Sequence, residues 1–201
     1  MGRRSAKQLF DRLALNCLWG ARLQLRRPQL ADAPQVYRYA AEPPASRFLA
    51  WTAHRNELET QQFLHDCIDA WHGMHGEERL PWVILADGVV VGMIEVKLKG
   101  CNAGMGYVLA PEAWGQGYAT EALGLVSEAL FHHTPVSAIW ALCVTQNPAS
   151  ARVLEKCGYQ REKLIPNYLP CPNLDGEKHD VWRYVRYRYP APATQSVAKP
   201  V

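Results

Sequence analysis

The sequence predicts a single α/β domain built on a mixed β-sheet, and three observations lead to this prediction. Stretches with strand and helix periodicity alternate along the 201-residue chain. An Asp-Gly pair separates two β-branched stretches, which indicates an antiparallel hairpin. Two strand-to-helix junctions follow one another, as expected where neighbouring strands run parallel. The length suits one well-buried core and is too short for two full-sized domains.

The N-terminal half is expected to contain one strand and two helices. Residues 21–27 alternate apolar and polar side chains, which predicts a strand. Asp32 is a predicted cap for the short helix that follows it. Apolar residues recur at helical spacing from Asn56 to Trp71 and predict a second, amphipathic helix, whereas residues 72–81 are expected to form a loop.

The C-terminal half is expected to supply most of the sheet. Residues 82–100 form the predicted hairpin, with Asp87 and Gly88 in its turn. Further strands are predicted at 104–110 and 136–145, and the second is almost entirely apolar, as expected when both faces of a strand are covered. A helix follows each of them. A turn-rich segment then leads to an aromatic strand at the end of the domain.

Composition and charge exclude several classes of protein. The formal net charge is +3, from 22 Lys and Arg against 19 Asp and Glu, which is compatible with an anionic ligand but is no nucleic-acid signature. The six cysteines contain no CxxC pair and predict reduced thiols in a cytoplasmic protein. No secretory signal or long uncharged apolar span is found, so no membrane association is expected.

The histidines do not predict a metal site. They include an adjacent pair and several in loops, without Cys or carboxylate partners at ligand spacing. We therefore expect no metal. The histidines without such partners are His72, His75, His132 and His133.

The segment WGQGYATEAL places two glycines at the start of a predicted helix. Glycine leaves the backbone accessible, and a helix start carries unpaired N–H groups and partial positive charge, so this junction favours a phosphate. A dinucleotide-binding fingerprint is excluded because Thr120 occupies the third glycine slot. No GKS or GKT follows, which excludes a P-loop. A second junction, at Asn147, predicts a cleft at the same sheet edge.

These two junctions together resemble the acyl-CoA-binding motifs of the GNAT superfamily of N-acetyltransferases, in its RimJ/RimL-like branch. The resemblance is carried by WGQGYATEAL and NPASARVLEKCGY, and it extends to LQLRRPQLADAPQVY, GMGYVLAPEAW and DGEKHDVWRYV, over residues 21 to 188. It implies a twisted, mostly antiparallel sheet of about seven strands, flanked by helices and opened by a central V-shaped splay. The expected organisation is an N-terminal extension (1–20), the acetyltransferase domain (21–189) and a flexible tail (190–201).

The resemblance implies acetyl-CoA as co-substrate. A backbone cradle at Gly115 to Ala119 would hold the pyrophosphate, and the strand that precedes it would pair with the pantetheine arm. For Asn147, a simple helix cap is the competing interpretation. The residues implied in binding are Val108, Leu109, Trp114, Gly115, Gln116, Gly117, Tyr118, Ala119, Thr120, Asn147 and Ser150.

The implied chemistry is acetyl transfer to an amine, which needs a base for the ammonium and a donor for the leaving thiolate. Leu154 stands where many relatives have a tyrosine, so Ser150 is the predicted donor. Gly104 stands where relatives often carry Glu, and Glu95 becomes the first base candidate, with an early-loop carboxylate, Glu42, second. For both carboxylates, a surface location without function is the competing interpretation.

The acceptor is left open at this point. It is expected to be a protein N-terminus or a small amine such as a polyamine, amino acid or aminoglycoside, in a pocket between the loops at 43–51 and 166–175. Tyr168, in the loop before the last strand, resembles acceptor-side tyrosines of the branch. A catalytically weak acyl-CoA-binding sensor is the alternative, and relatives of this branch are often homodimers.

Overall fold

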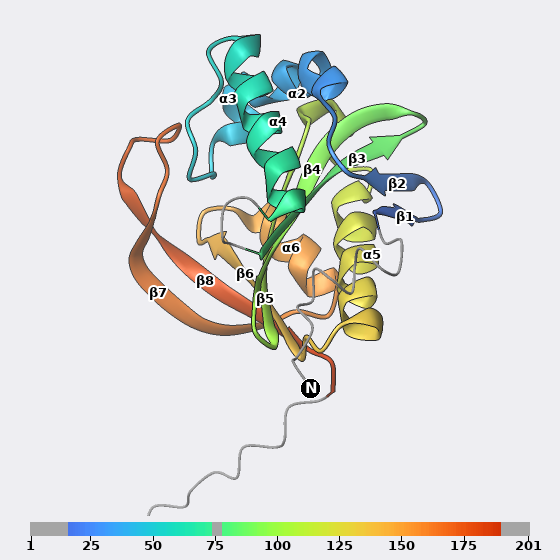
Figure 1. Ribbon diagram of the computed structural model, residues 1–201. Coiled ribbons are helices and arrows are strands. Elements are labelled where there is room, and N and C mark those ends of the chain that lie inside the picture. Colours follow the sequence, from blue (N-terminus) through green and yellow to red (C-terminus); the bar gives the residue numbers. More distant parts are fainter. Residues whose placement is uncertain (1–15, 74–77, 190–201) are drawn as a thin grey trace, which may run out of the picture.

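The computed structural model describes residues 16–73 and 78–189. Within them, eight strands form one open sheet in the order β1-β2-β3-β4-β5-β6-β8-β7 (Figure 1). Every neighbouring pair is antiparallel except β5 and β6. The strands are β1 (Cys17–Trp19), β2 (Leu23–Arg26), β3 (Glu78–Ala86), β4 (Val89–Lys99), β5 (Asn102–Leu109), β6 (Ala138–Val144), β7 (Gln160–Pro170) and β8 (Lys178–Tyr187).

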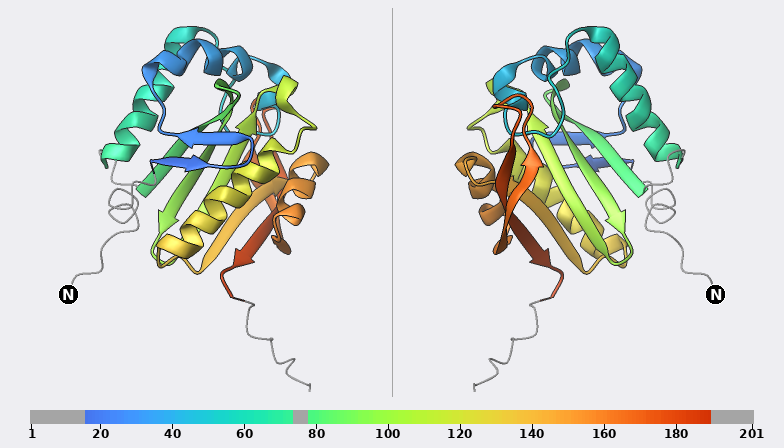
Figure 2. Two further views of the ribbon diagram at one scale, coloured as in Figure 1. Left: turned by 90° about the vertical axis from the view of Figure 1, so that its right-hand side faces the viewer. Right: turned by 90° about the vertical axis from the view of Figure 1, so that its left-hand side faces the viewer.

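Helices cover both faces of the sheet (Figure 2). Helices α5 and α6 pack on each other and on β2, β5 and β6, whereas α2 and α4 pack on β3 and β4. The helices are α2 (Ala33–Ala40), α3 (Pro43–Ser46), α4 (Glu57–His72), α5 (Tyr118–His133) and α6 (Pro148–Lys156), with 3-10 turns η1 (Leu30–Asp32) and η2 (Pro111–Ala113). The predicted α/β class and its mostly antiparallel sheet are confirmed, with one more strand than expected.

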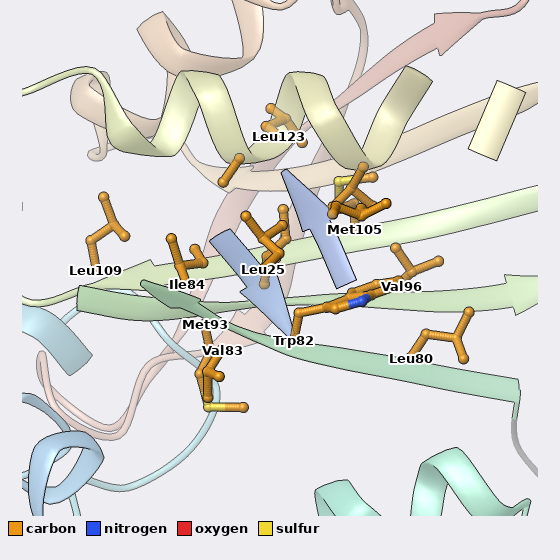
Figure 3. Close-up of a cluster of buried hydrophobic side chains, with 14 of the residues drawn as sticks. Leu25, Leu80, Trp82, Val83, Ile84, Met93, Val96, Met105, Leu109 and Leu123 are labelled. Atoms are coloured by element: carbon orange, nitrogen blue, oxygen red, sulfur yellow. The ribbon is translucent and has the colours of Figure 1, made fainter. Parts of the chain in front are cut away.

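The core lies on both sides of the central strands. Met93 and Val83 point to one face, whereas Leu109 and Leu123 lie on the other (Figure 3). All four side chains are at most 7% exposed. Burial of apolar surface on two faces is the main stabilising term in a fold of this kind, and it explains why the central strands are almost entirely apolar.

The parallel pair β5 and β6 separates after three residues. Their pairing runs only from Asn102 opposite Ala138 to Gly104 opposite Trp140. Strand β5 continues beside β4 as far as Leu109, and β6 continues beside β8 as far as Val144. The two strands therefore diverge toward their carboxyl ends, which confirms the predicted V-shaped splay.

Local signals gave accurate turns and helix ends. Asp87 and Gly88 have φ of 49° and 79°, as a tight two-residue hairpin turn requires. The Asn56 side chain accepts a hydrogen bond from the N–H of Glu59 at 3.0 Å and caps α4. Gly73 ends the helix with a φ of 75°.

Asp32 occupies the N-cap position of α2, as predicted, but its side chain makes no capping hydrogen bond to this helix. Asp32 is the last residue of η1, and its carboxylate accepts hydrogen bonds from the Gln29 N–H and the Arg26 guanidinium at 2.7 to 2.8 Å. The carboxylate is almost completely buried, so its pairing with Arg26 satisfies it more fully than a cap of α2 would. Helix α2 continues directly from the 3-10 turn.

Several segments expected to be loops or extensions contain regular structure. Strand β3 starts at Glu78 inside the predicted loop. Strand β1 lies inside the 1–20 segment, where three residues are too few for a periodicity signal. Strand β7 includes the PNYLP segment, because an edge strand with register shifts between Ile165 and Leu169 tolerates proline. The predicted tail, 190–201, lies outside the described residues.

Candidate functional site

The glycine loop before α5 has the properties of an anion site. Gly115 and Gly117 have φ of 75° and 80°, a conformation that L side chains rarely adopt. Gly117 is the N-cap of α5 and supplies no side-chain cap. The first N–H groups of this 16-residue helix therefore stay available at an exposed loop, at the positive end of the helix dipole.

Arg22 on the β1–β2 turn reaches this loop, and the sequence analysis missed it. Its Nη1 donates to the carbonyl of Gln116 at 2.8 Å, and its guanidinium lies 4.9 Å from the centre of the Tyr118 ring. A half-exposed ion pair to Glu121 at 2.9 Å holds it there. A guanidinium beside uncapped helix N–H groups adds positive charge where a phosphate would bind.

The register of β5 shows which backbone groups face the splay. The N–H of Ala110 donates to the Val91 carbonyl at 2.9 Å, so Ala110 faces β4. Backbone groups alternate in direction along a strand, so Val108 also faces β4 and Leu109 faces the splay. The Leu109 carbonyl already accepts from the Trp114 indole at 3.0 Å. The N–H groups of Leu109 and of Tyr107, two residues earlier, thus face the splay, with that of Leu109 nearer its open end, and Trp114 holds the loop to the strand.

Ser150 and Asn147 stand on the opposite arm of the splay, at the start of α6. Asn147 Oδ1 accepts from the Ser150 N–H at 3.1 Å, which confirms the predicted cap. The Ser150 Oγ lies 2.9 Å from the hydroxyl of Tyr107 on β5. This hydrogen bond crosses from one strand of the splay to the helix that follows the other.

Tyr107 was not predicted, although a signal for it exists. It lies two residues before Leu109 and therefore on the same face of β5. Burial raises the pKa of the Tyr107 hydroxyl, and the hydrogen bond with Ser150 opposes that rise only in part. The hydroxyl therefore keeps its proton at neutral pH and can donate a hydrogen bond.

The other predicted catalytic residues do not join Ser150. Glu95 on β4 is paired with Arg79 at 2.5 Å and with Lys97 at 3.8 Å, and it shares the face of Met93 rather than that of Tyr107. Tyr168 is half-exposed on the edge strand β7, not in a loop. The structure therefore places only Ser150 of these three candidates at the splay.

The position of Gly104 has a structural reason. A Cβ atom there would lie 2.6 Å from the indole of Trp140, its partner on β6. The aromatic ring fills the space that a side chain at this position would need. A carboxylate cannot be accommodated without moving Trp140.

A small cavity lies beside the splay on the opposite face from α5. Its volume is about 30 Å³, close to the space that one water molecule takes in the liquid. Met93 and Val108 are directly paired across β4 and β5 and contribute one wall. The lining residues are Val36, Tyr39, Ala40, Trp51, His54, Phe63, Met93 and Val108.

The described residues hold no group of three or more His, Cys, Asp or Glu side chains that could bind a metal ion. His75 lies outside them. No helix within 16–73 and 78–189 is both long and apolar enough to cross a membrane. All six cysteines are described and are free thiols.

An open sheet that splays beside a glycine-rich helix start is the arrangement that the transferase motifs implied. The model of the acetyltransferase (GNAT) domain family matches residues 22–160. The chain belongs to this family and is a GNAT-family N-acetyltransferase.

Two curated relatives are themselves uncharacterised. The N-acetyltransferase YoaA of Bacillus subtilis (strain 168) is 34% identical over 79 residues, which are 39% of this chain and 45% of YoaA. The chain thus spans less than half the length of this relative. The N-acetyltransferase p20 of Bacillus licheniformis is 23% identical over 158 residues, with 77% of this chain and 88% of p20 covered.

Three solved structures share the fold. A GNAT acetyltransferase from Bacillus anthracis superposes with a TM-score of 0.74 at 23% identity, over 86% of this chain and 98% of its own. RimJ of Mycobacterium smegmatis, in complex with CoA-disulfide, superposes with a TM-score of 0.73 at 24% identity, over 85% of this chain and 87% of its own. Spermidine N-acetyltransferase from Vibrio cholerae, in complex with CoA and spermine, superposes with a TM-score of 0.70 at 16% identity, over 84% of this chain and 96% of its own. At these identities the likeness concerns the fold.

Proposed function

We propose that the protein transfers an acetyl group from acetyl-CoA to a primary amine by direct attack in a ternary complex. The observation that carries this proposal is the splay, with the uncapped start of α5 and the Tyr107–Ser150 hydrogen bond on its two sides. The CoA bound in the RimJ structure and the CoA and spermine in the Vibrio cholerae enzyme support it.

Acetyl-CoA would bind along the opening of the splay. The pyrophosphate fits the backbone N–H groups at Gly115 to Thr120, with Arg22 beside them. The pantetheine amides would pair with the exposed edge of β5, where the register favours Leu109 over Val108. The Asn147 side-chain amide keeps its N–H groups for this arm, because only its oxygen is used in the cap.

The chemistry requires two proton movements. The ammonium of the acceptor loses a proton, and its nitrogen then attacks the thioester carbon. The Leu109 N–H is placed to stabilise the tetrahedral oxyanion. As the C–S bond breaks, the Ser150 hydroxyl donates to the leaving sulfur, and Tyr107 donates in turn to Ser150. Glu95 is the base candidate that the sequence suggests, although two ion pairs engage it, and Tyr168 is a proposed contact of the acceptor.

The acceptor proposed at this level is a protein N-terminus or a small-molecule amine. The domain would comprise residues 21–189 together with β1, followed by the 190–201 tail. The free thiols favour a cytoplasmic location.

Thermal-shift titrations test the proposal, with acetyl-CoA and CoA as ligands and NAD as control. A ligand that binds only the folded state raises the melting temperature, so acetyl-CoA and CoA should raise it and NAD should not. An amine panel then tests turnover. Ser150→Ala should keep the acetyl-CoA shift and lower kcat about 10- to 100-fold. Tight CoA binding without turnover of any amine would favour the sensor alternative instead.

A further inference from the structure

The small cavity beside Val108 contains two polar groups in an otherwise apolar lining. Tyr39 is almost completely buried, and within the described residues its hydroxyl has no hydrogen-bond partner. Buried hydroxyls are nearly always satisfied, so an orphaned one points to a group that binds there. The second polar group is the imidazole of His54. Trp51, His54 and Phe63 are each partly exposed, so the cavity is open to a ligand.

Three hydrogen bonds fix His54 at the wall of the cavity. The backbone N–H of His54 donates to the carbonyl of Ala40 at the end of α2, at 3.1 Å. Its Nδ1 lies 2.8 Å from the hydroxyl of the fully buried Thr60 on α4. The preceding N–H, of Ala53, donates to the Asn173 side chain at 2.9 Å. Such a backbone is preorganised. In the tautomer in which Nδ1–H donates to the Thr60 hydroxyl, Nε2 carries the lone pair that can accept a proton from a ligand.

The surroundings of the imidazole favour its neutral form. The ring packs between Trp51 and Phe63, with centroid distances of 5.3 and 5.6 Å. Burial lowers the pKa of His54 below its ordinary value of 6.5, and Glu59 on α4 opposes this only in part. The Glu59 carboxylate is itself paired with Arg55 at 2.5 Å. The remaining facing groups are the Tyr39 hydroxyl from α2 and apolar side chains from β4 and β5.

We propose that this cavity receives the reacting amine, that His54 accepts its proton, and that the acceptor is a primary amine with no second positive charge near the reacting one. The inference rests on the proposed function and names its base and substrate class. One proton passes from R–NH3⁺ to His54 Nε2, and the nitrogen lone pair forms the C–N bond while the carbonyl π electrons move to oxygen. As the tetrahedral intermediate collapses, the C–S bond breaks, the nitrogen loses its second proton, and the leaving thiolate gains one by way of the Ser150 hydroxyl. His54 then releases its proton to solvent through its exposed edge.

Three observations favour His54 over Glu95 as the base. His54 lines the same cavity as Val108, the neighbour of the residue that faces the splay. Glu95 is instead engaged in two ion pairs. The apolar lining also lowers the pKa of a bound ammonium by desolvation, so its proton is transferred more easily to a neutral imidazole.

The charges around the cavity select the class of acceptor. No Asp or Glu is among the lining residues. The flanking segment, 47–55, contains Arg47 and Arg55 and no carboxylate, and the nearby carboxylate of Glu59 is already paired with Arg55. A polyamine or aminoglycoside brings further ammonium groups that would need anionic partners. A peptide N-terminus with neutral neighbours does not.

The test compares two acceptor probes on the full chain: Ala-Ala-Ala amide, with one ammonium, and spermidine. Wild type should acetylate the tripeptide amide with at least about tenfold higher kcat/KM. For that probe, kcat/KM should fall as the pH drops through the lowered pKa of His54, since only the neutral imidazole accepts a proton. In His54→Gln this fall at acidic pH, the acid limb of the pH profile, should disappear, and kcat should drop about 100-fold. Acetyl-CoA should still raise the melting temperature of the variant.

His65→Gln is the control, because His65 is an exposed histidine on α4, the helix that follows the loop of His54, and this variant should match wild type. Tyr39→Phe should raise KM for the tripeptide amide and keep the acid limb. Four results would each overturn the inference alone. His54→Gln could keep the fall in kcat/KM at acidic pH, or Glu95→Gln could lose it instead. Spermidine could be the better acceptor, or the tripeptide amide could stay unmodified while acetyl-CoA still raises the melting temperature. Absence of any acetyl-CoA shift would overturn the proposed function as well.

Discussion

The two sides of the splay are built in different ways. On the side of α5 and α6, the site consists of two short contiguous stretches, Gly115 to Thr120 and Asn147 to Ser150, each at a helix start. On the side of α2 and α4, the cavity takes its lining from two helices, a loop and two strands between Val36 and Val108. The first side depends on local backbone geometry, and the second depends on tertiary packing.

This difference indicates where substitutions should act independently. A substitution in a contiguous backbone cradle alters one ligand and leaves the rest of the fold intact. A substitution around the proposed acceptor cavity changes the position of its lining residues through loops that are hydrogen-bonded to each other over long sequence distances. The Asn173 side chain, for example, donates to the carbonyls of Ser46 and Trp51 at 3.0 and 2.7 Å.

The largest expected effect is on the cofactor side. Gly117→Val puts a β-branched side chain at a φ of 80° and toward Arg22, whose Nη2 would lie 3.5 Å from a Cβ atom at this position. We expect acetyl-CoA to bind at least about 100-fold more weakly, measured by isothermal titration calorimetry. Gly124→Ala, in the middle of α5 with open space around its Cβ, is the control. It should bind normally, and equal loss in both variants would contradict the cradle.

The acceptor side should respond to Asn173 with little change on the cofactor side. Asn173→Ala removes three hydrogen bonds to the 46–53 segment, each contributing roughly 1 kcal/mol. We expect KM for the amine to rise about tenfold, with the dissociation constant of acetyl-CoA within about twofold of wild type. Steady-state kinetics and calorimetry check this. Asn102→Ala, at an exposed strand end, is the control and should change neither KM for the amine nor the dissociation constant of acetyl-CoA. If Asn173→Ala raised that dissociation constant about tenfold as well, the two sides would be coupled.

The floor of the splay offers a closely matched pair of substitutions. Gly104→Ala brings a Cβ atom to 2.6 Å from Trp140, whereas Gly106→Ala meets no atom within 4 Å. We expect the first to lower the free energy of unfolding by about 1 to 2 kcal/mol, and the second to leave it unchanged or slightly raised. Urea denaturation measures both. Equal stabilities would mean that Trp140 does not fill this space.

The smallest effect concerns the ion pair of Arg22. Partial burial acts to raise the pKa of Glu121, but hydrogen bonds and charge from Arg22 lower it overall. Because the folded-state pKa is depressed, the pair stabilises the fold above the unfolded value of about 4.5, and this stability is lost as the pH falls through the folded value. Glu121→Gln should therefore reduce stability at pH 7 by a fraction of a kcal/mol, and its difference from wild type should shrink as the pH is lowered toward 3. Urea unfolding at both pH values tests this, and an equal difference at pH 3 would contradict it.

The sequence predicted the features that depend on local backbone geometry. The Asp87-Gly88 turn, the Asn147 cap, the helix from Asn56 and the helix start after Gly117 each follow from a few adjacent residues. Side-chain pairs were missed where their partners lie far apart. Tyr107 meets Ser150 across 43 positions and Arg22 meets Gln116 across 94, so no window of sequence contains either pair.

Two further predictions named residues whose partners lie elsewhere in the fold. Asp32 carries the side chain of a helix cap, but the partly buried guanidinium of Arg26 competes for its carboxylate. Glu95 is the base candidate from the sequence because it stands on the strand beside the site, and its ion pair with Arg79 cannot be read from the chain. His54 carries no motif at all, since its significance comes from the aromatic rings and the hydroxyl packed around it.

Asn173 uses both of its amide protons and its carbonyl oxygen to hold the segment from Ser46 to Ala53 against the turn after β7. Breaking one of these bonds does not release the segment, because the other two still tether it. The wall of the acceptor cavity and the β7–β8 hairpin should therefore open as one cooperative unit in hydrogen exchange. Substitutions in a hairpin that does not line the cavity could then change how fast an acceptor enters it.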